Sequence, residues 1–362
     1  MKHNAYVRFK DRQQGLTLME LMIAMLIGVL LLLGITSMFM SNKRVYKEQE
    51  YMSRLQENAR FALDILLYDI RMAGYTGCSE DITSVSNHLN GTTDPKALLS
   101  FSNAVEGSES KGHWLPSDST EIVSDTDPVH TTSASKMVAG TDGISIRYLD
   151  PSGIQIAEEM PQPSAELKVT KLGNLKEGDM IAVSDCNSAD IMQLTQTQLT
   201  AGIGHLQHNT GDVDPPPGNA TQALQKRYST DAEIVSFISR RYYIGNGSGK
   251  GPSLYRMDNG GTPLELIEGV EQMQILYGLD TDGNKIADTY VNAANVGAGN
   301  WGNIVSVRLA LLFRTSDSNN QIDKDTGSYS LLGAGGTTVS APNDYYRRRV
   351  FTTTIQIRNR SV

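Results

Sequence analysis

The stretch "GLTLMELMIAMLIGVLLLLGITSMFM", residues 15–40, contains an apolar segment long enough to cross a bilayer. Between Leu16 and Met40 its only charged side chain is Glu20. A helix of this length spans the roughly 30 Å hydrocarbon core of a membrane. An ionised side chain within that core is costly, so Glu20 is a candidate functional residue. The alternative is an ordinary signal anchor in which Glu20 lies at the depth of the lipid headgroups.

The residues before the apolar segment indicate how the chain is processed. Residues 1–14 are polar and carry four basic residues and one acidic residue. A secretory signal peptide would place its cleavage site after the apolar core, next to small residues. Here the plausible cleavage site, Gly15–Leu16, comes before the core. We therefore expect residues 1–15 to be a leader whose removal leaves the hydrophobic helix in the mature chain.

This arrangement resembles the class III signal of type IV pilins and type II secretion pseudopilins. In that signal a Gly is followed by a hydrophobic residue, Thr-Leu, one variable residue and Glu, and residues 15–20 read Gly-Leu-Thr-Leu-Met-Glu. Leu16 departs from the common pattern, which has Phe at this position. The resemblance implies that prepilin peptidase cleaves after Gly15 and that Leu16 becomes the N-methylated terminus.

The same resemblance implies an assembly role for Glu20. In a pilus, the carboxylate of an incoming subunit would pair with the terminal amine of its neighbour. A buried charge is tolerated only when it is paired, so a wrong stagger between subunits would leave a bare carboxylate in an apolar core. Glu20 is thus interpreted as a residue that sets register, with no catalytic role.

The helical pattern continues beyond the membrane segment. Residues 41–73 contain no Pro or Gly, and their apolar residues recur with helical spacing at Val45, Met52, Leu55, Ala59, Ala62, Leu66 and Ile70. Gly74 is placed to end the helix as a C-cap glycine. We expect one helix of about 85 Å, whose 16–40 half crosses the membrane or fills a filament core. The 41–73 half would pack on a globular head; a soluble coiled coil attached to an anchor is the alternative.

Residues 74–362 have the pattern of a β-rich head, which makes the predicted fold class α+β. Alternating or β-branched runs predict strands at residues 144–149, 180–186, 273–278, 304–313 and 351–358. Polar stretches predict loops at residues 87–96, 106–128 and 210–220. The segment from Ser79 to Met137 shows little apolar periodicity and is expected to be a loop-rich insertion.

Several blocks of this head resemble the PilW family, minor pilins of type IV pilus systems. They are "LQENARFALDILLYDIRMAGYTGC", "SDCNSADIMQ", "LYRMDNGGTPLELIEGVEQMQILYG", "WGNIVSVRLALLFRT" and "RRRVFTTTIQIRNR". The resemblance implies a type IV pilin-like fold and a non-enzymatic role. The chain would join other minor pilins in a complex that primes pilus growth, with a place at or near the tip. A J-like minor pseudopilin of type II secretion and a tip adhesion module are the alternatives.

The resemblance also implies partners and a location. The partners would be other minor pilins, the pilus assembly machinery and prepilin peptidase. The protein would cross the inner membrane once with its head in the periplasm, and would then join the pilus on the cell surface. The processes that it would serve are twitching motility and, under the alternative role, cell adhesion.

The charge of the chain argues against nucleic acid as a partner. The formal net charge is −8. Removing a leader with four basic residues and one acidic residue leaves −11 for the mature chain. The clusters Arg240-Arg241 and Arg347–Arg349 lie beside apolar, strand-like residues. We interpret them as solvated faces or ion pairs, with a phosphate-binding patch as the alternative.

The chain has two cysteines, Cys78 and Cys186. An oxidising periplasm would let them form a disulfide, which would close a loop of about 107 residues. Two separate buried thiols are the alternative. With two cysteines and no nearby pair of histidines, a zinc site is not expected.

Motifs of enzymes are weak. His205 and His208 form an H-x-x-H in a polar loop without an adjacent acid, so a surface pair is favoured over a metal site. The stretch "GNGSGKG" at residues 245–251 lacks the spacing of a phosphate-binding loop and is interpreted as a hairpin turn. No nucleophile motif is found, so no enzymatic activity and no cofactor are predicted, apart from a candidate calcium loop.

That loop is "DTDGNKIAD", residues 280–288. Asp280, Asp282, Asn284 and Asp288 would supply oxygen ligands at a spacing that suits Ca²⁺. Lys285 stands where a calcium loop has glycine, and the acid at the twelfth position is missing because Val291 stands there. The alternative, which we favour, is an Asp-Gly-Asn turn between two strands.

Overall fold

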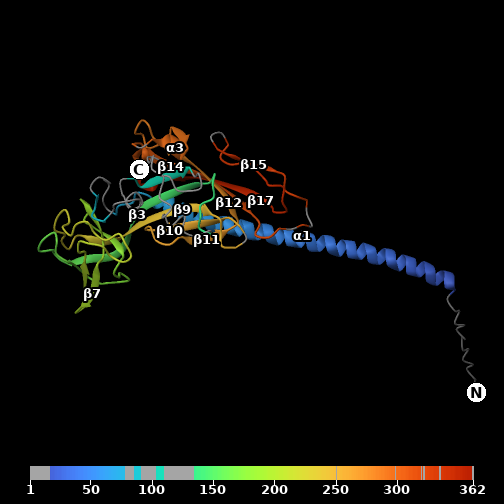
Figure 1. The fold of residues 1–362 in the computed structure, drawn as a ribbon, viewed down its shortest axis with the longest axis horizontal. Coiled ribbons are helices and arrows are strands. Elements are labelled where there is room, and N and C mark those ends of the chain that lie inside the picture. The colour runs from blue at the N-terminus through green and yellow to red at the C-terminus, as the bar shows by residue number, and fades with distance from the viewer. Residues whose placement is uncertain are drawn as a thin grey trace, which may run out of the picture. The chain divides into compact units, whose positions relative to one another are not determined.

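The computed structural model describes residues 17–77, 85–90, 103–109, 134–249, 251–297, 299–318, 320, 323–333 and 336–360. The chain divides into two compact units, Met1–Met52 and Ser53–Val362. Helix α1 (Leu18–Met72) begins in the first unit and ends in the second (Figure 1). The expected architecture, a long N-terminal helix followed by a β-rich head, is confirmed.

The described part of the first unit is Thr17 and the helix α1 up to Met52. Every large apolar side chain between Leu18 and Met40 is exposed, and the helix is long and apolar enough to cross a membrane. The helix starts at Leu18, two residues later than expected, and Thr17 precedes it. Gly15 and Leu16, the predicted cleavage site, lie outside the described residues.

The last part of α1 belongs to the head and buries one face. Its buried residues are Leu55, Ala59, Ala62, Leu66, Asp69 and Ile70. The two alanines are fully buried, and their small side chains let the helix backbone come close to the sheets. The predicted stripe therefore becomes a buried face from Leu55 onward, while Val45 is exposed. Gly74, with a φ of 73°, follows the helix as predicted, and its N–H donates to the carbonyl of Arg147 at 2.9 Å.

Among the described residues, eleven strands form the larger sheet. Its main path runs β1 (Val85–Asn87), β6 (Ala189–Gln193), β5 (Met180–Ser184), β9 (Glu233–Gly245), β3 (Asp142–Glu158), β4 (Leu167–Val169), β8 (Ile203–Gln207) and β7 (Gln196–Thr200). Three strands attach beside this path: β2 (Val105–Glu109) to β3, β10 (Ser253–Asp258) to β9, and β11 (Leu264–Glu268) to β10.

The smaller sheet is antiparallel and has the order β13 (Thr289–Val291), β12 (Val270–Leu279), β14 (Ile304–Arg314), β17 (Arg348–Gln356). The hairpin of β15 (Ser328–Ser330) and β16 (Thr338–Ser340) packs on its outer face through Leu331. Short helical turns are α3 (Ala293–Val296), η3 (Trp301–Asn303) and η4 (Arg358–Arg360).

The head has two main hydrophobic cores. One joins the buried face of α1 to the smaller sheet, to the start of β3 and to the end of β9. The other lies around the end of β3, β4, β5 and β8. Strands β3 and β9 are long and pair along most of their length (Figure 1). Both contribute residues to each core, so they connect the two.

The five predicted strands are confirmed in β3, β5, β12, β14 and β17. The expectation for residues 79–137 is wrong in part. Residues Val105–Glu109 form a strand that is almost wholly buried, although a loop was predicted from residue 106. Asn87, predicted to begin a loop, ends β1. Both strands are short and lack clear alternation, and pairing with β3 and β6 makes them strands.

Candidate assembly site on the long helix

Glu20 and Thr17 form a capping box at the start of α1. The backbone N–H and the hydroxyl of Thr17 each donate to Glu20 Oε2 at 2.9 Å, and the N–H of Glu20 donates to Thr17 Oγ1 at 3.2 Å. This reciprocal pair satisfies backbone donors that the first helical turn leaves free. The pattern Thr-x-x-Glu is visible in the sequence and could have been recognised there.

The capping box uses one oxygen of Glu20. Within the part of the chain that the structure describes, no group is bonded to the second oxygen, Oε1. The side chain is exposed, as are its apolar neighbours. One carboxylate can therefore cap its own helix and still accept a hydrogen bond from a cation outside the chain.

Asp69, near the other end of α1, is a second acid on the apolar face, and sequence reasoning missed it. Its side chain is 1% exposed. It accepts hydrogen bonds from Tyr148 at 2.9 Å, from Arg240 at 2.8 Å and from the hydroxyl of Tyr242. Asp69 thereby ties the helix to β3 and β9. The sequence feature that could have identified Asp69 is its position three residues after Leu66, which places it on the buried face of the helix.

This network changes the acid–base properties of its members. Burial, followed by the charge of Asp69, raises the pKa of the Tyr242 hydroxyl, and the same two causes raise that of Tyr148. Burial is the largest single influence on Arg240 and lowers its pKa, but Asp69 and the other acidic groups around it together outweigh burial, and the net direction is upward. The tyrosines stay neutral and Arg240 stays charged, so the network is an ion pair with two neutral donors.

The interpretation of the arginine clusters as ion pairs is confirmed for Arg240 and Arg348. Arg240 binds Asp258 as well as Asp69. Arg348 is buried on the smaller sheet and binds Glu271, Asp325 and Asp344 at 2.6, 3.1 and 2.7 Å. These guanidinium groups are occupied by carboxylates of the same chain.

Cys186 is disulfide-bonded, and its backbone has a φ of 71° at the turn between β5 and β6. Cys78, the other cysteine of the sequence, lies outside the described residues. The pairing of the two therefore stays a prediction.

The candidate calcium loop lies between β12 and β13, which pair antiparallel, so the turn is confirmed. Oxygens of Asp280, Asp282 and Asp288 lie within 4.8 Å of one another. The loop also satisfies them itself: Gly283 and Lys285 donate backbone N–H groups to Asp280, and the hydroxyl of Thr281 lowers the pKa of Asp288. Asn284 accepts the N–H of Ile286 at 2.8 Å.

The two histidines of the H-x-x-H stretch have separate partners. His205 contacts Glu166 at 2.9 Å, whereas His208 is 1% exposed and contacts the carbonyl of Ala165 at 3.0 Å. The expectation of a surface pair is therefore wrong for His208, whose pKa is lowered by burial. The hairpin predicted at residues 245–251 is confirmed, because Gly245 pairs with Ser253 across β9 and β10.

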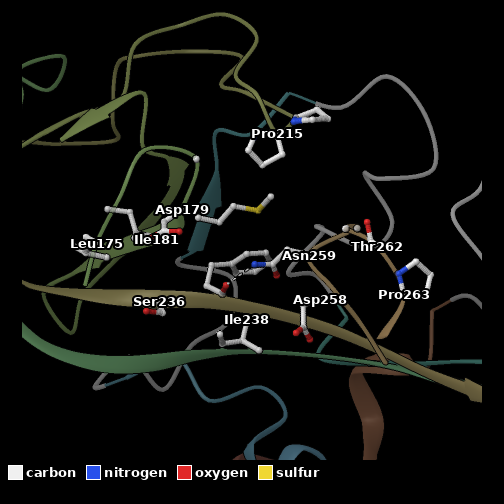
Figure 2. A pocket seen from close by; sticks show the side chains of 16 residues that line it. Leu175, Asp179, Ile181, Pro215, Ser236, Ile238, Asp258, Asn259, Thr262 and Pro263 are labelled. Carbon is white, nitrogen blue, oxygen red and sulfur yellow. Dashed lines mark hydrogen bonds between the residues drawn. The ribbon is translucent and has the colours of Figure 1, made fainter. Parts of the chain in front are cut away.

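A cleft of about 680 Å³ lies where β9 changes its pairing partner from β5 to β10. Asn259 fills the gap between these partners: its Oδ1 accepts the N–H of Ser239 at 2.8 Å and its Nδ2 donates to the carbonyl of Phe237 at 3.4 Å. Figure 2 shows Pro215 on one side of Asn259 and Thr262 on another. The nearby carboxylate of Asp258 is bound by two arginines.

Two family models match the chain. Residues 241–359 match Type IV Pilus-assembly protein W, and residues 10–36, which include Gly15, Leu16 and Glu20, match the Prokaryotic N-terminal methylation motif. No curated protein matches the chain. Among solved structures, the chain is similar to the type IV-like pilin TTHA1219 from Thermus thermophilus, with 13% identity and a TM-score of 0.34 over 85% of this chain and 99% of that one.

Proposed function

We propose that this chain, a member of the PilW family of type IV pilus minor pilins, helps to prime pilus assembly and stays at or near the pilus tip. Members of this family are structural components of the pilus and not enzymes. The chain would act through lateral packing of α1 and through contacts between its head and the heads of other minor pilins.

The observation that carries this proposal is the division of α1 into two parts with opposite burial. The part from Leu55 to Ile70 buries its apolar face in the head, whereas the large apolar side chains of residues 18–40 are exposed. Exposed apolar surface of this extent needs an apolar environment. A membrane provides it before assembly, and the helices of other subunits would provide it in a filament core.

Processing supplies the first test. We propose that prepilin peptidase cleaves after Gly15, that Leu16 is then methylated and that the basic leader stays on the cytoplasmic side. The head would lie in the periplasm, where Cys78 and Cys186 can form a disulfide. Intact mass and N-terminal sequencing of the membrane-extracted protein would identify the terminus. A mature chain that begins before Leu16 would contradict the proposal.

The priming role is tested by deletion of the gene followed by complementation with the wild-type chain. We expect deletion to reduce surface pili and twitching, and complementation to restore both. Normal piliation and twitching after deletion would contradict a priming role. A pseudopilin of a secretion system is the alternative with the same physical mechanism, and the genes that neighbour this one would distinguish the two.

The cleft beside Asn259 is the observation that favours adhesion as a second function. It combines apolar walls with exposed polar groups, as ligand sites do. Thr262→Trp, at the exposed rim, would fill the cleft in the full-length chain. Under the adhesion hypothesis this variant keeps normal piliation and loses attachment to surfaces. Unchanged attachment would reject the cleft as an adhesion site.

Calcium at residues 280–288 stays a prediction of the sequence. Isothermal titration of the full-length protein with CaCl₂, after removal of metals, would measure it. Asp282→Asn with Asp288→Asn should abolish any heat of binding, and the matched control is Asp317→Asn, an acid outside the loop. Extracellular calcium sites bind with dissociation constants as weak as millimolar. If no heat of binding is seen at millimolar Ca²⁺, residues 280–288 form a turn and not a calcium site.

A further inference from the structure

The end of β2 and the start of β3 bring two carboxylates together inside the head. In the antiparallel register of these strands, Glu109 lies directly opposite Asp142. Opposed side chains lie on the same face, with Cβ atoms roughly 4.5–5.5 Å apart. This is the core face, because Val105 and Ile144, which share it, belong to the core around α1. Asp142 itself is 5% exposed.

Neither carboxylate has an ion-pair partner among the described residues. Asp142 Oδ2 accepts the backbone N–H of Ile275 at 2.7 Å, and Glu109 Oε1 accepts that of Ala293 at 2.9 Å. No described group is bonded to the other oxygen of either side chain. Two adjacent ionised carboxylates, Asp142 buried and Glu109 half-buried, would be unfavourable without a cation, and binding a proton is the simplest relief.

Tyr277 of β12 faces the same place. Its hydroxyl is buried without a hydrogen-bond partner, and it lies against Gly107, where an added Cβ would be 2.2 Å away. Gly107 shares the core face of β2 with Glu109, since side chains alternate along a strand. Because Gly107 has no side chain, the hydroxyl of Tyr277 fits next to the two carboxylates.

The other charged groups near Asp142 and Glu109 lie on the opposite face of the sheet. Glu106 of β2 points to the opposite face of the sheet, where it binds Arg147 at 3.0 Å, close to Arg241. Burial, followed by the charge of Glu109, raises the pKa of Asp142 to about 8, although the N–H of Ile275 opposes this. Burial also raises the pKa of Glu109. Asp142 therefore keeps its proton at neutral pH.

We propose that Asp142 and Glu109 form a proton-binding pair that holds β2 on the head while one of the two carboxyls is neutral. Loss of the proton leaves two negative charges facing each other and favours release of β2 from β3. Release would expose the edge of β3 that pairs with β2, from Asp142 to Ile146, with its unpaired backbone groups. The head would thus present a different surface as the external pH rises.

Linkage gives the direction and size of the effect. Between about pH 4 and pH 8 the docked state keeps a proton that an open, solvated state releases, so docking weakens as pH increases. The equilibrium constant for opening should rise about tenfold per pH unit over this range. Above pH 8 both states are ionised and the constant should level off.

Hydrogen exchange of the full-length protein in detergent, with EDTA present so that no divalent cation replaces the proton, tests this proposal. Rates are divided by the intrinsic rate at each pH. For peptides covering residues 103–109 we expect the wild-type opening constant to rise about fiftyfold from pH 6 to pH 8, since Asp142 is half ionised in the docked state at pH 8. In Asp142→Asn it should stay flat, since Asn is neutral and still accepts the N–H of Ile275. Peptides from β14 serve as the internal reference.

A second variant keeps the test decisive if Asp142→Asn folds poorly. Glu109→Gln removes the neighbouring charge, so Asp142 should ionise at lower pH and the rise should begin at lower pH than in the wild type. The same pH dependence in the wild type and in both variants would overturn the proposal. So would a wild-type β2 whose protection does not change between pH 6 and pH 9.

Discussion

The two parts of α1 each carry one carboxylate among apolar residues, and the two carboxylates are satisfied in different ways. Asp69 is buried and accepts three hydrogen bonds from β3 and β9, one of them from the charged Arg240. Glu20 is exposed, and its described partner is Thr17, one turn away on the same helix. Arg240 of the head balances the charge of Asp69, whereas no cation among the described residues balances that of Glu20.

This difference separates folding from assembly. Removing Asp69 should damage the head of an isolated subunit, because its partners are intramolecular and buried. Removing the charge of Glu20 should leave the subunit intact and weaken its association with others. The same type of residue on one helix therefore predicts two different phenotypes, and substitutions can test each one.

The largest effect is expected for Asp69→Ala. It leaves the largely buried Arg240 without its main counter-charge and deprives two tyrosine hydroxyls of an acceptor. We expect the head to lose about 3–5 kcal/mol of unfolding free energy. Urea denaturation of the full-length protein in detergent, followed by tryptophan fluorescence, would measure it. Asp64→Ala on the exposed face, where the ion pair with Arg60 is 3.7 Å long, is the matched control and should change little.

An equal loss for Asp69→Ala and Asp64→Ala would show that the buried network does not hold the helix on the head. Asp69→Asn gives an intermediate case, since it keeps an acceptor for a tyrosine but removes the charge. Its loss of stability should fall between those of the two alanine variants.

The next effect concerns Glu20→Gln and appears in assembly. Glutamine keeps the shape and can still accept from Thr17, so the capping box persists. What is lost is the charge that would pair with the terminal amine of a neighbour. We expect normal cleavage and membrane insertion, with recovery of partner pilins reduced by roughly a hundredfold or more. Co-purification with the other minor pilins would measure this, and equal recovery would reject the pairing.

The sequence predicted the elements that depend on local pattern. The apolar run without Pro gave α1, and alternation gave the long strands β3, β12 and β14. It did not predict the network of Asp69, because its partners Tyr148 and Arg240 come from strands 79 and 171 residues away. Their meeting is decided by how the helix packs on the sheets, which local periodicity does not specify.

The strand β2 was missed for a related reason. Its residues, Val-Glu-Gly-Ser-Glu, have low strand propensity and include a glycine that local pattern cannot explain. Gly107 is required because Tyr277 occupies the space of its side chain. The burial of His208 could not be read from the sequence either, since its partner is the backbone carbonyl of Ala165, 43 residues away.

The third-largest effect on stability is expected from reduction of the disulfide. This experiment tests whether Cys78, shortly after the end of α1, is bonded to Cys186. We expect reduction to cost about 2–4 kcal/mol of unfolding free energy, within the limit of about 4–5 kcal/mol for a loop of this length. Denaturation with and without reductant would measure it in the wild type. The Cys78→Ser variant should match the reduced wild type and should not respond to reductant. A response in Cys78→Ser would contradict the Cys78–Cys186 pairing.

The smallest effect is expected for Thr17→Ala, and it decides which property of Glu20 matters. The substitution removes the hydroxyl of the capping box but keeps the carboxylate charge. Loss of an N-cap costs about 1 kcal/mol of helix stability, which corresponds to at most a roughly fivefold change in an association that depends on the first turn. Thr17→Ser keeps the hydroxyl and should behave like the wild type. Amide exchange at Glu20 should quicken in Thr17→Ala, because its N–H loses the bond to Thr17 Oγ1, while recovery of partner pilins should fall far less than with Glu20→Gln. If Thr17→Ala reduced recovery as much as Glu20→Gln, Glu20 would act in assembly by ordering the first turn of its own helix. Glu20 would then, like Asp69, act through a partner within the chain, and the proposed pairing with a neighbouring subunit would be rejected.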